Sequence, residues 1–203
     1  MSQPEGTATA DEIKSSPRVK WALSKLKGGS AFLDIGCNDG FFLKQVKADR
    51  VIGIDSDESL VEQVKNEGLE AYYAYSWGIP FEDNTFDRIH FGQTIAHMKK
   101  ALGVKSLHEI YRVLEPKGIV AFTTVVGPTF SSALYYATHD KLVTLVESWF
   151  HVHEWEPTEL LTILSGIGFE AKKFWVLPQV EKTAPSYKAF RFVQCWLLTK
   201  KEE

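Results

Sequence analysis

A short loop of glycine and acidic residues, set between two mostly apolar segments, carries the residue types that bind a nucleoside. Residues 31–35 form the first segment, and the loop Gly36–Cys37–Asn38–Asp39–Gly40 follows it directly. Gly36 and Gly40 allow backbone angles and a close ligand approach that a side chain would block. Asp55 ends the second segment, nineteen positions after Gly36, a spacing at which an acid accepts hydrogen bonds from both ribose hydroxyls. The pattern predicts a ligand that contains adenosine.

The charge of the loop separates two kinds of adenosine cofactor. A dinucleotide-binding loop has the pattern G-x-G-x-x-G, whereas this loop has glycine only at Gly36 and Gly40. Asp39 falls where a pyrophosphate would lie, and a carboxylate repels phosphate. S-adenosylmethionine has a sulfonium, an ammonium and one carboxylate but no phosphate. The loop therefore favours S-adenosylmethionine, with a nicotinamide-dependent dehydrogenase as the alternative.

Five motifs along the chain resemble those of the class I S-adenosylmethionine-dependent methyltransferases, in particular the subgroup that acts on small molecules. In order, they are Leu33–Gly40, Gly53–Asp55, Ile79–Asp87, Glu109–Gly118, and Glu159–Leu161 followed by Gly168–Phe169. Two positions depart from the family pattern: Asn38 replaces the middle glycine of the loop, and Tyr75 stands where many relatives have an aspartate for the adenine amino group. Tyr75 favours adenine contacts through the Ser76 backbone and stacking on Trp77.

The resemblance implies the residues that would bind the cofactor. Asp34 and the backbone of the glycine loop would line its amino-acid end, Asp55 would hold the ribose, and the residues after the fourth strand would lie beside the methionine and the acceptor. The implied cofactor-binding positions are Asp34, Gly36, Cys37, Asn38, Gly40, Asp55, Ser56, Ser76, Trp77, Gly92 and Gln93.

The expected reaction is a direct in-line displacement that moves the methyl group to a small, partly apolar acceptor. Positioning and water exclusion supply much of the rate of such a transfer. A hydroxyl acceptor needs a base, and His97 and His139 are the candidates. Two alternatives stay open: a catalytically silent module that binds S-adenosylmethionine or regulates a partner, and a methyltransferase that acts on RNA or protein.

Three histidines raise the question of a metal site. His139, His151 and His153 are close in sequence, and three histidines can bind zinc. No fourth ligand or catalytic carboxylate has a convincing spacing, so no metal is expected.

The elements that must position these residues alternate between strands and helices. Apolar runs predict strands at 31–35, 50–54, 69–75, 86–91, 119–125, 171–177 and 190–199. Helical spacing predicts intervening helices at 41–47, 58–67, 104–114 and 157–166. We therefore predict a doubly wound α/β fold, with helices on both faces of a mostly parallel seven-stranded sheet. The family resemblance implies that the last strand is reversed.

The chain is expected to form one domain. Residues 1–10 are small and polar and predict a mobile tail, followed by a single methyltransferase-like domain over 11–203. Within it, the aromatic-rich stretch 127–150 predicts a helical insert that packs on the sheet end or forms a lid over the acceptor.

Composition limits the partners. The net charge of -3 gives no general attraction to polyanions, so nucleic acid is an unlikely partner, and the lysines after Ala171 are interpreted first as a solvated face. No apolar run approaches the roughly 20 residues of a membrane-spanning helix, so no membrane insertion is expected. Cys37 and Cys195 lie far apart in sequence, which favours a reduced, cytoplasmic location. The oligomeric state is left open.

Overall fold

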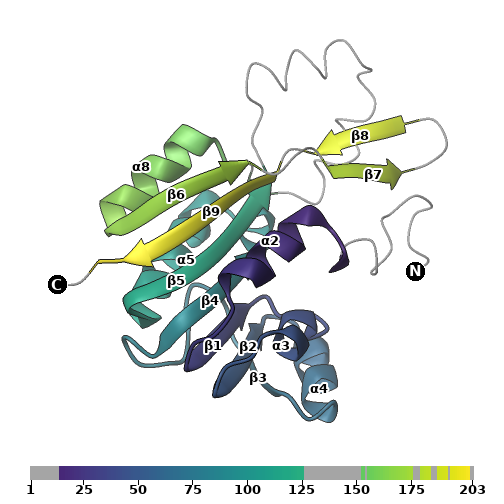
Figure 1. Ribbon diagram of the computed structural model, residues 1–203, viewed down its shortest axis with the longest axis vertical. Coiled ribbons are helices and arrows are strands. Elements are labelled where there is room, and N and C mark those ends of the chain that lie inside the picture. Colours follow the sequence, from purple (N-terminus) through teal and green to yellow (C-terminus); the bar gives the residue numbers. More distant parts are fainter. Residues whose placement is uncertain are drawn as a thin grey trace.

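A seven-stranded sheet lies at the centre of the computed structural model, which describes residues 14–125, 152–153, 155–175, 179–183, 187–191 and 193–201. The strand order is β3-β2-β1-β4-β5-β9-β6 (Figure 1). The strands are β1 (Ala31–Ile35), β2 (Arg50–Asp55), β3 (Glu70–Tyr73), β4 (Phe86–Gly92), β5 (Leu114–Val125), β6 (Phe169–Trp175) and β9 (Val193–Lys200). Strands β1 to β5 pair in parallel, whereas β9 runs antiparallel to β5 and β6. The predicted fold class, with its reversed last strand, is confirmed.

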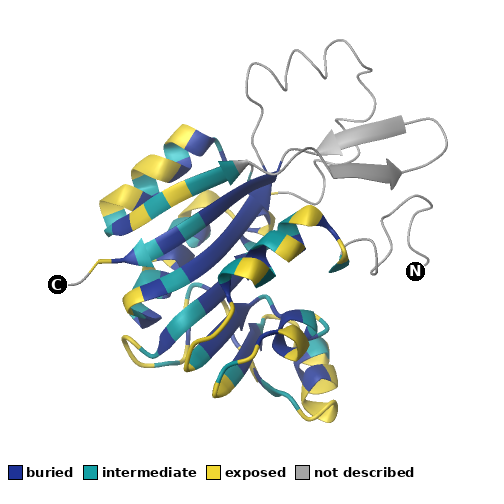
Figure 2. Cartoon of the chain, viewed as in Figure 1, coloured by how far each residue is buried: buried dark blue, intermediate teal, exposed yellow. Residues whose placement is uncertain are grey.

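Helices cover both faces of this sheet. They are α2 (Pro17–Lys25), α3 (Phe41–Gln45), α4 (Glu58–Asn66), the short 3-10 helix η1 (Thr94–His97), α5 (Lys100–Val113) and α8 (Pro157–Ile167). Apolar residues of α2, α3 and α4 belong to one buried cluster, and those of α5 and α8 belong to another. In Figure 1, α2 lies in front of the sheet and α5 and α8 lie behind it. Figure 2 shows that these helices alternate buried and exposed residues, as helices with one buried side do.

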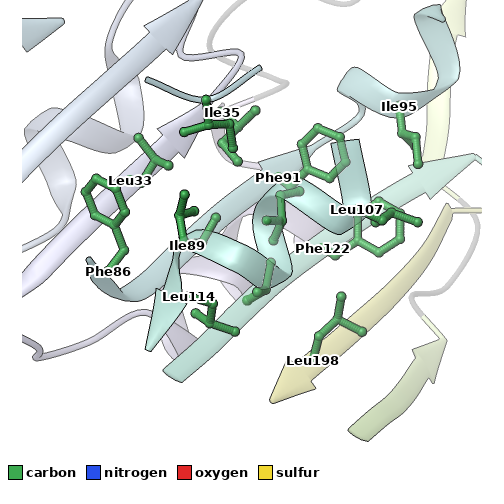
Figure 3. Packing of buried hydrophobic residues seen from close by; sticks show 14 of the residues in the cluster. Leu33, Ile35, Phe86, Ile89, Phe91, Ile95, Leu107, Leu114, Phe122 and Leu198 are labelled. Atoms are coloured by element: carbon green, nitrogen blue, oxygen red, sulfur yellow. The ribbon is translucent and has the colours of Figure 1, made fainter. Parts of the chain in front are cut away.

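The central strands are buried on both faces because their alternate side chains enter the two clusters. On β1, Phe32 belongs to the cluster beneath α2, whereas Leu33 and Ile35 belong to the cluster beneath α5. Ile89 and Phe91 of the neighbouring strand β4 join the second cluster (Figure 3). Burial of each such side chain contributes about 1.5 to 3 kcal/mol. The carboxyl ends of β1 and β4, and the loops that follow them, therefore rest on a firmly packed base.

Several element boundaries differ from the sequence prediction. Helix α5 begins at Lys100 rather than at residue 104 and so includes Gly103. A Cβ at this position would lie 2.6 Å from the Trp155 ring, so the close packing favours glycine. Strand β5 begins at Leu114 rather than at residue 119, and residues 115–118 form an irregularity within the strand, where its register against β4 shifts. Helix α3 ends at Gln45, earlier than predicted.

The C-terminal region contains a feature that the apolar pattern did not predict. Between β6 and β9, strands β7 (Gln179–Thr183) and β8 (Tyr187–Arg191) pair with each other as a separate two-stranded sheet. The single strand predicted at 190–199 is therefore divided between β8 and β9. The predicted tail at 1–10 and the insert at 127–150 lie outside the described residues. Within the described part of the chain, no helix is long and apolar enough to cross a membrane.

Candidate functional site

A cavity of about 360 Å³ opens at the carboxyl ends of β1, β2 and β4. Ligands of open α/β sheets bind at this edge. Nine of the sequence-predicted site residues line it: Gly36, Asn38, Asp55, Ser56, Ser76, Trp77, Gly92, Gln93 and His97. Seven further lining residues were not predicted as site residues: Ile35, Ile54, Leu60, Ala74, Tyr75, Thr94 and Met98. Most of the latter are apolar, and in the sequence they look like ordinary core residues.

The loop after β1 is fixed by backbone hydrogen bonds to β2. The N–H groups of Gly36 and Cys37 both donate to the carbonyl of Ile54, at 2.8 and 3.0 Å. The backbone of Gly36 has a φ of 77°, and a Cβ there would lie 2.4 Å from the Thr94 hydroxyl oxygen. Only glycine fits both the angle and the contact, so Gly36 and Thr94 together set how closely the loops after β1 and β4 approach.

Asp55 ends β2 with its carboxylate held at the cavity wall. One oxygen accepts a hydrogen bond from the Asn38 N–H and the other accepts one from the Asp57 N–H, both at 3.0 Å. Asp57 in turn caps α4 by accepting from the Ser59 N–H at 2.9 Å. A carboxylate oxygen accepts more than one hydrogen bond, so Asp55 retains the capacity to bind two hydroxyls of a ligand.

Asp34 lies behind the loop rather than in the cavity. It is 2% exposed, and one carboxylate oxygen lies 2.7 Å from Nδ1 of His90. The His90 ring stacks on Phe42, with 3.6 Å between the ring centroids. Burial raises the pKa of Asp34 above its ordinary value, although the neighbouring His90 ring acts in the opposite direction. The predicted contact between Asp34 and the cofactor stays a prediction, and any influence of this side chain on the cavity would pass through the loop.

Two other predicted positions also turn away from the cavity. The Cys37 thiol packs against β2, where a Cβ on Gly53 would lie 2.7 Å from its sulfur. Burial raises the pKa of Cys37 to about 12. Gly40 has a φ of 71° and faces Val64 and Leu69. These residues shape the loop from the side opposite the cavity.

An aromatic wall, formed by Tyr75 and Trp77, closes one side of the cavity. The two rings stack with 4.7 Å between centroids and an interplanar angle of 15°. The Tyr75 hydroxyl lies 2.9 Å from that of Tyr73. Ser76 lies between Tyr75 and Trp77 in the sequence, and its buried hydroxyl lies 2.8 Å from the Ser106 hydroxyl of α5. Because its side chain is engaged there, Ser76 presents mainly its backbone to the cavity.

The residues after β4 form the opposite wall. Gln93 adopts a left-handed backbone, with φ 61°, and its N–H donates to the carbonyl of Thr123 at 2.8 Å. The Thr94 hydroxyl donates to the carbonyl of Ile35 at 3.1 Å. His97 ends η1 and is exposed at the cavity edge. His139, the other candidate base, lies outside the described residues.

The described residues contain no cluster of three or more His, Cys, Asp and Glu side chains arranged to hold a metal. His153 lies 3.7 Å from a carboxylate oxygen of Glu159 and contacts the ring of Trp155 edge-on. His139 and His151 lie outside the described residues, so the three-histidine hypothesis is not tested.

The charge of the cavity fits S-adenosylmethionine better than a phosphate-containing cofactor. Asp55 contributes a carboxylate, and no lysine or arginine occurs among the described lining residues. Phosphates are usually bound by cations or by helix N-termini, and helix α3 here has only five residues. A cationic sulfonium and a neutral adenosine suit these surroundings.

Comparison with known proteins agrees with this geometry. Residues 33–122 match the family described as a methyltransferase domain. These residues make up less than half of the chain, and their match agrees with the resemblance to the class I S-adenosylmethionine-dependent methyltransferases.

Several named relatives are similar to part of the chain. A probable tRNA methyltransferase 9B of Homo sapiens is 37% identical over 53% of this chain and 24% of its own length. The tRNA (carboxymethyluridine(34)-5-O)-methyltransferase of Arabidopsis thaliana is 25% identical over 66% of this chain and 33% of its own length. A sterol 24-C-methyltransferase of Schizosaccharomyces pombe is 29% identical over 57% of this chain and 33% of its own length. The matched stretches thus span a quarter to a third of these relatives.

Solved structures share the fold over nearly the whole chain. A SAM-dependent methyltransferase from Archaeoglobus fulgidus has a TM-score of 0.71 and 14% identity, and the match covers 95% of each chain. A SAM-dependent methyltransferase from Thermotoga maritima has a TM-score of 0.69 and 19% identity, with 94% of this chain and 89% of that one covered. At these identities the likeness concerns the fold.

Proposed function

We propose that this chain transfers a methyl group from S-adenosylmethionine to a small, partly apolar acceptor. The observation that carries the proposal is the cavity itself, which combines the Asp55 carboxylate with the aromatic wall. No lysine or arginine occurs among the described residues that line it. Its volume of about 360 Å³ lies within the range of small-ligand pockets. Much of the remaining lining is apolar, which suits a partly apolar acceptor beside the cofactor.

Each wall of the cavity has a task in this reaction. The cofactor supplies an electrophilic methyl group on its sulfonium when bound. Asp55 accepts hydrogen bonds from the ribose hydroxyls, and the aromatic wall offers a ring face to the adenine. Gln93, fixed through its backbone to β5, lies on the wall opposite. These residues orient the reactants and exclude water, which supplies much of the rate in a direct displacement.

His97 is the candidate base when the acceptor is a hydroxyl. It lies at the edge of the cavity, where an acceptor would enter. An amine acceptor needs only its neutral form and no base. Replacement of His97 by Gln would therefore lower kcat for hydroxyl acceptors and leave amine acceptors nearly unaffected.

Titration calorimetry with S-adenosylmethionine and with S-adenosylhomocysteine tests the proposed cofactor. We expect Asp55→Ala to weaken binding by about 1.5 to 3 kcal/mol, because a charged hydrogen-bond acceptor is lost. Asp57→Asn is the matched control, since Asp57 also accepts backbone hydrogen bonds but does not line the cavity. The cofactor assignment fails when the parent protein binds neither ligand at millimolar concentration. Binding without transfer to any member of a broad acceptor panel would support the silent-module alternative.

RNA is the second candidate acceptor. Of the three relatives described above, two are named tRNA methyltransferases. In this structure, the ammonium groups of Lys25 on α2 and Lys172 on β6 lie 5.4 and 5.5 Å from the centroid of the Phe174 ring. Basic side chains around an aromatic ring are a common arrangement at nucleic-acid surfaces.

Fluorescence anisotropy with a labelled single-stranded RNA distinguishes this candidate. RNA binding that weakens with salt and is reduced in the double variant Lys25→Gln/Lys172→Gln would favour it. Lys65→Gln serves as the control, because Lys65 is exposed on α4 and pairs with Glu62. Equal, weak binding by the parent and both variants would favour the small acceptor.

A further inference from the structure

One side of helix α5 carries three polar residues that all contact the segment between β3 and β4. Ser106, Glu109 and Arg112 are spaced by three positions, so they lie on the same side of the helix. We call these three residues the α5 polar stripe. The segment that they contact, residues 74–85, begins at the aromatic wall and ends where β4 starts.

Arg112 binds this segment at several points. Its guanidinium donates to the carbonyls of Ile79 and Phe81, at 2.9 and 2.8 Å. It also donates to an oxygen of Asp83 at 2.9 Å. The carbonyl of Arg112 accepts from the Asn84 N–H at 3.0 Å. The planar, multivalent guanidinium suits such a set of acceptors, whereas a lysine ammonium could satisfy fewer of them.

Glu109 fixes the guanidinium and also binds the segment directly. Its two oxygens accept from Arg112 at 2.8 and 2.9 Å. The oxygen that takes the second of these bonds also accepts from the Ile79 N–H, at 2.9 Å. The hydrogen bond from Arg112 lowers the pKa of Glu109, so the pair stays ionised at neutral pH. Because both partners are less than one-third exposed, solvent weakens this pair less than it weakens a fully exposed one.

The contacts of the stripe begin at the cavity wall. Ser106 is fully buried, and its hydroxyl contacts that of Ser76, the residue between Tyr75 and Trp77 in the sequence. Two residues beyond Trp77, Ile79 is held by both Glu109 and Arg112. The wall is therefore tied to α5 on both sides of Trp77. Strand β3 ends at Tyr73, and the last hydrogen bond to the sheet before the wall runs from the Ala74 N–H to the carbonyl of Asp55, at 2.9 Å.

We propose that the α5 polar stripe positions the aromatic wall for the cofactor, with Arg112 and Glu109 as positioning residues that do not touch the ligand. This inference rests on the proposed function, since it assigns the wall to S-adenosylmethionine. The energetic reasoning is direct: a wall set in place before binding saves the ligand the free-energy cost of ordering it.

Calorimetric titration with S-adenosylhomocysteine tests the inference without reliance on turnover. We expect Arg112→Gln to raise the Kd by about tenfold, the equivalent of about 1.4 kcal/mol. Arg50→Gln is the matched control, because Arg50 also pairs with a glutamate, Glu70, at 2.7 Å but neither residue lines the cavity. That variant should change the Kd by less than about twofold.

Hydrogen exchange tests whether the ion pair acts locally. An ion pair that only stabilised the fold would change exchange throughout the sheet and not in the segment of the wall alone. In Arg112→Gln, backbone amides of residues 76–85 should exchange faster, while those of β1 and β4 keep the protection of the parent. Bound S-adenosylhomocysteine should restore part of the protection. If Arg112→Gln does not fold by circular dichroism, Ser106→Ala replaces it, since that change removes one contact of the wall and leaves the ion pair intact.

The outcomes separate the two proposals. A parent protein that binds no S-adenosylhomocysteine overturns the proposed function, and the present inference with it. A parent that binds the ligand, together with folded Arg112→Gln and Ser106→Ala variants of unchanged affinity, overturns the inference alone. A higher Kd with uniformly faster exchange across the sheet also overturns it, because the ion pair would then act on the whole fold.

Discussion

Asn38 and Gln93 line the cavity from the loops after β1 and β4, and both have left-handed backbones, with φ of 48° and 61°. Such angles are uncommon for residues other than glycine and are concentrated at functional sites. Asn38 holds Asp55 through its N–H alone, so a glycine keeps that bond and removes a side chain from the cavity. We expect Asn38→Gly to bind S-adenosylhomocysteine at least as tightly as the parent in a calorimetric titration. Its free energy of unfolding should change by no more than about 1 kcal/mol.

The companion variant for this position is Asn38→Ala, which retains a Cβ but loses the amide. A left-handed alanine costs about 1 to 2 kcal/mol, and this cost should appear in chemical denaturation. Tenfold weaker binding by Asn38→Gly would show instead that the Asn38 amide contacts the ligand.

The two cysteines should be inert in the folded protein. Cys37 is 3% exposed and Cys195 is fully buried, and burial raises the pKa of each thiol to about 12. The thiolate is the reactive form, so neither should react with a thiol reagent at pH 8 on the timescale of a model thiol. Both should react at once in denaturant. Rapid modification of the native protein would contradict the buried position of Cys37 behind the glycine loop.

At the scale of elements, an ion pair joins the first turns of α5 and α8. Lys100 pairs with Glu159, and this hydrogen bond is the largest influence that lowers the pKa of Glu159 below 4.5. A carboxylate with a lowered pKa in the folded state contributes stability above its unfolded pKa, and this stability is lost as the pH falls through the folded value. Between about pH 5 and pH 3, Glu159→Gln should therefore lose less stability than the parent, by up to about 1 kcal/mol.

Urea denaturation at a series of pH values measures this difference. Glu170→Gln is the control, since Glu170 is 65% exposed and lies 4.0 Å from Lys201. Parallel pH profiles for the parent and Glu159→Gln would show that the pair between α5 and α8 is unimportant for stability.

Helices, strands and turns that depend on neighbouring residues could be predicted from the sequence. Contacts between residues far apart in the sequence, which depend on the order of strands in the sheet, could not. The segment from Ala31 to Asp55 was predictable because its turn residues and apolar runs are contiguous. The pairing of Asp34 with His90 was not predictable, because it depends on β1 lying beside β4 as well as beside β2. Asp34 and His90 are register partners across these strands although 56 positions separate them. The α5 polar stripe was missed for the same reason, since Arg112 gives no local sign of the carbonyls that it binds.

At the scale of the whole molecule, Lys200 ties the reversed strand β9 to the parallel part of the sheet. It is only 9% exposed, and its ammonium donates to the Asn84 side-chain oxygen and to the carbonyls of Tyr111 and Leu114, at 2.6, 3.0 and 2.9 Å. It therefore bridges the turn before β4, the last turn of α5 and the start of β5. Replacement by Met preserves much of the apolar stem but removes the ammonium donor, including the buried bond to the carbonyl of Leu114.

We expect Lys200→Met to lower the free energy of unfolding by about 2 to 3 kcal/mol, because buried acceptors lose a charged donor. The neighbouring residue supplies the control: Lys201 is 65% exposed, so Lys201→Met should stay within about 0.5 kcal/mol of the parent. Guanidinium denaturation followed by circular dichroism measures both. Since Lys200 lies at the end of the sheet opposite the cavity, S-adenosylhomocysteine affinity should be unchanged in folded Lys200→Met. Weaker binding by Lys200→Met would mean that a shift of β9 also displaces β5 and β4 and so changes the cofactor site.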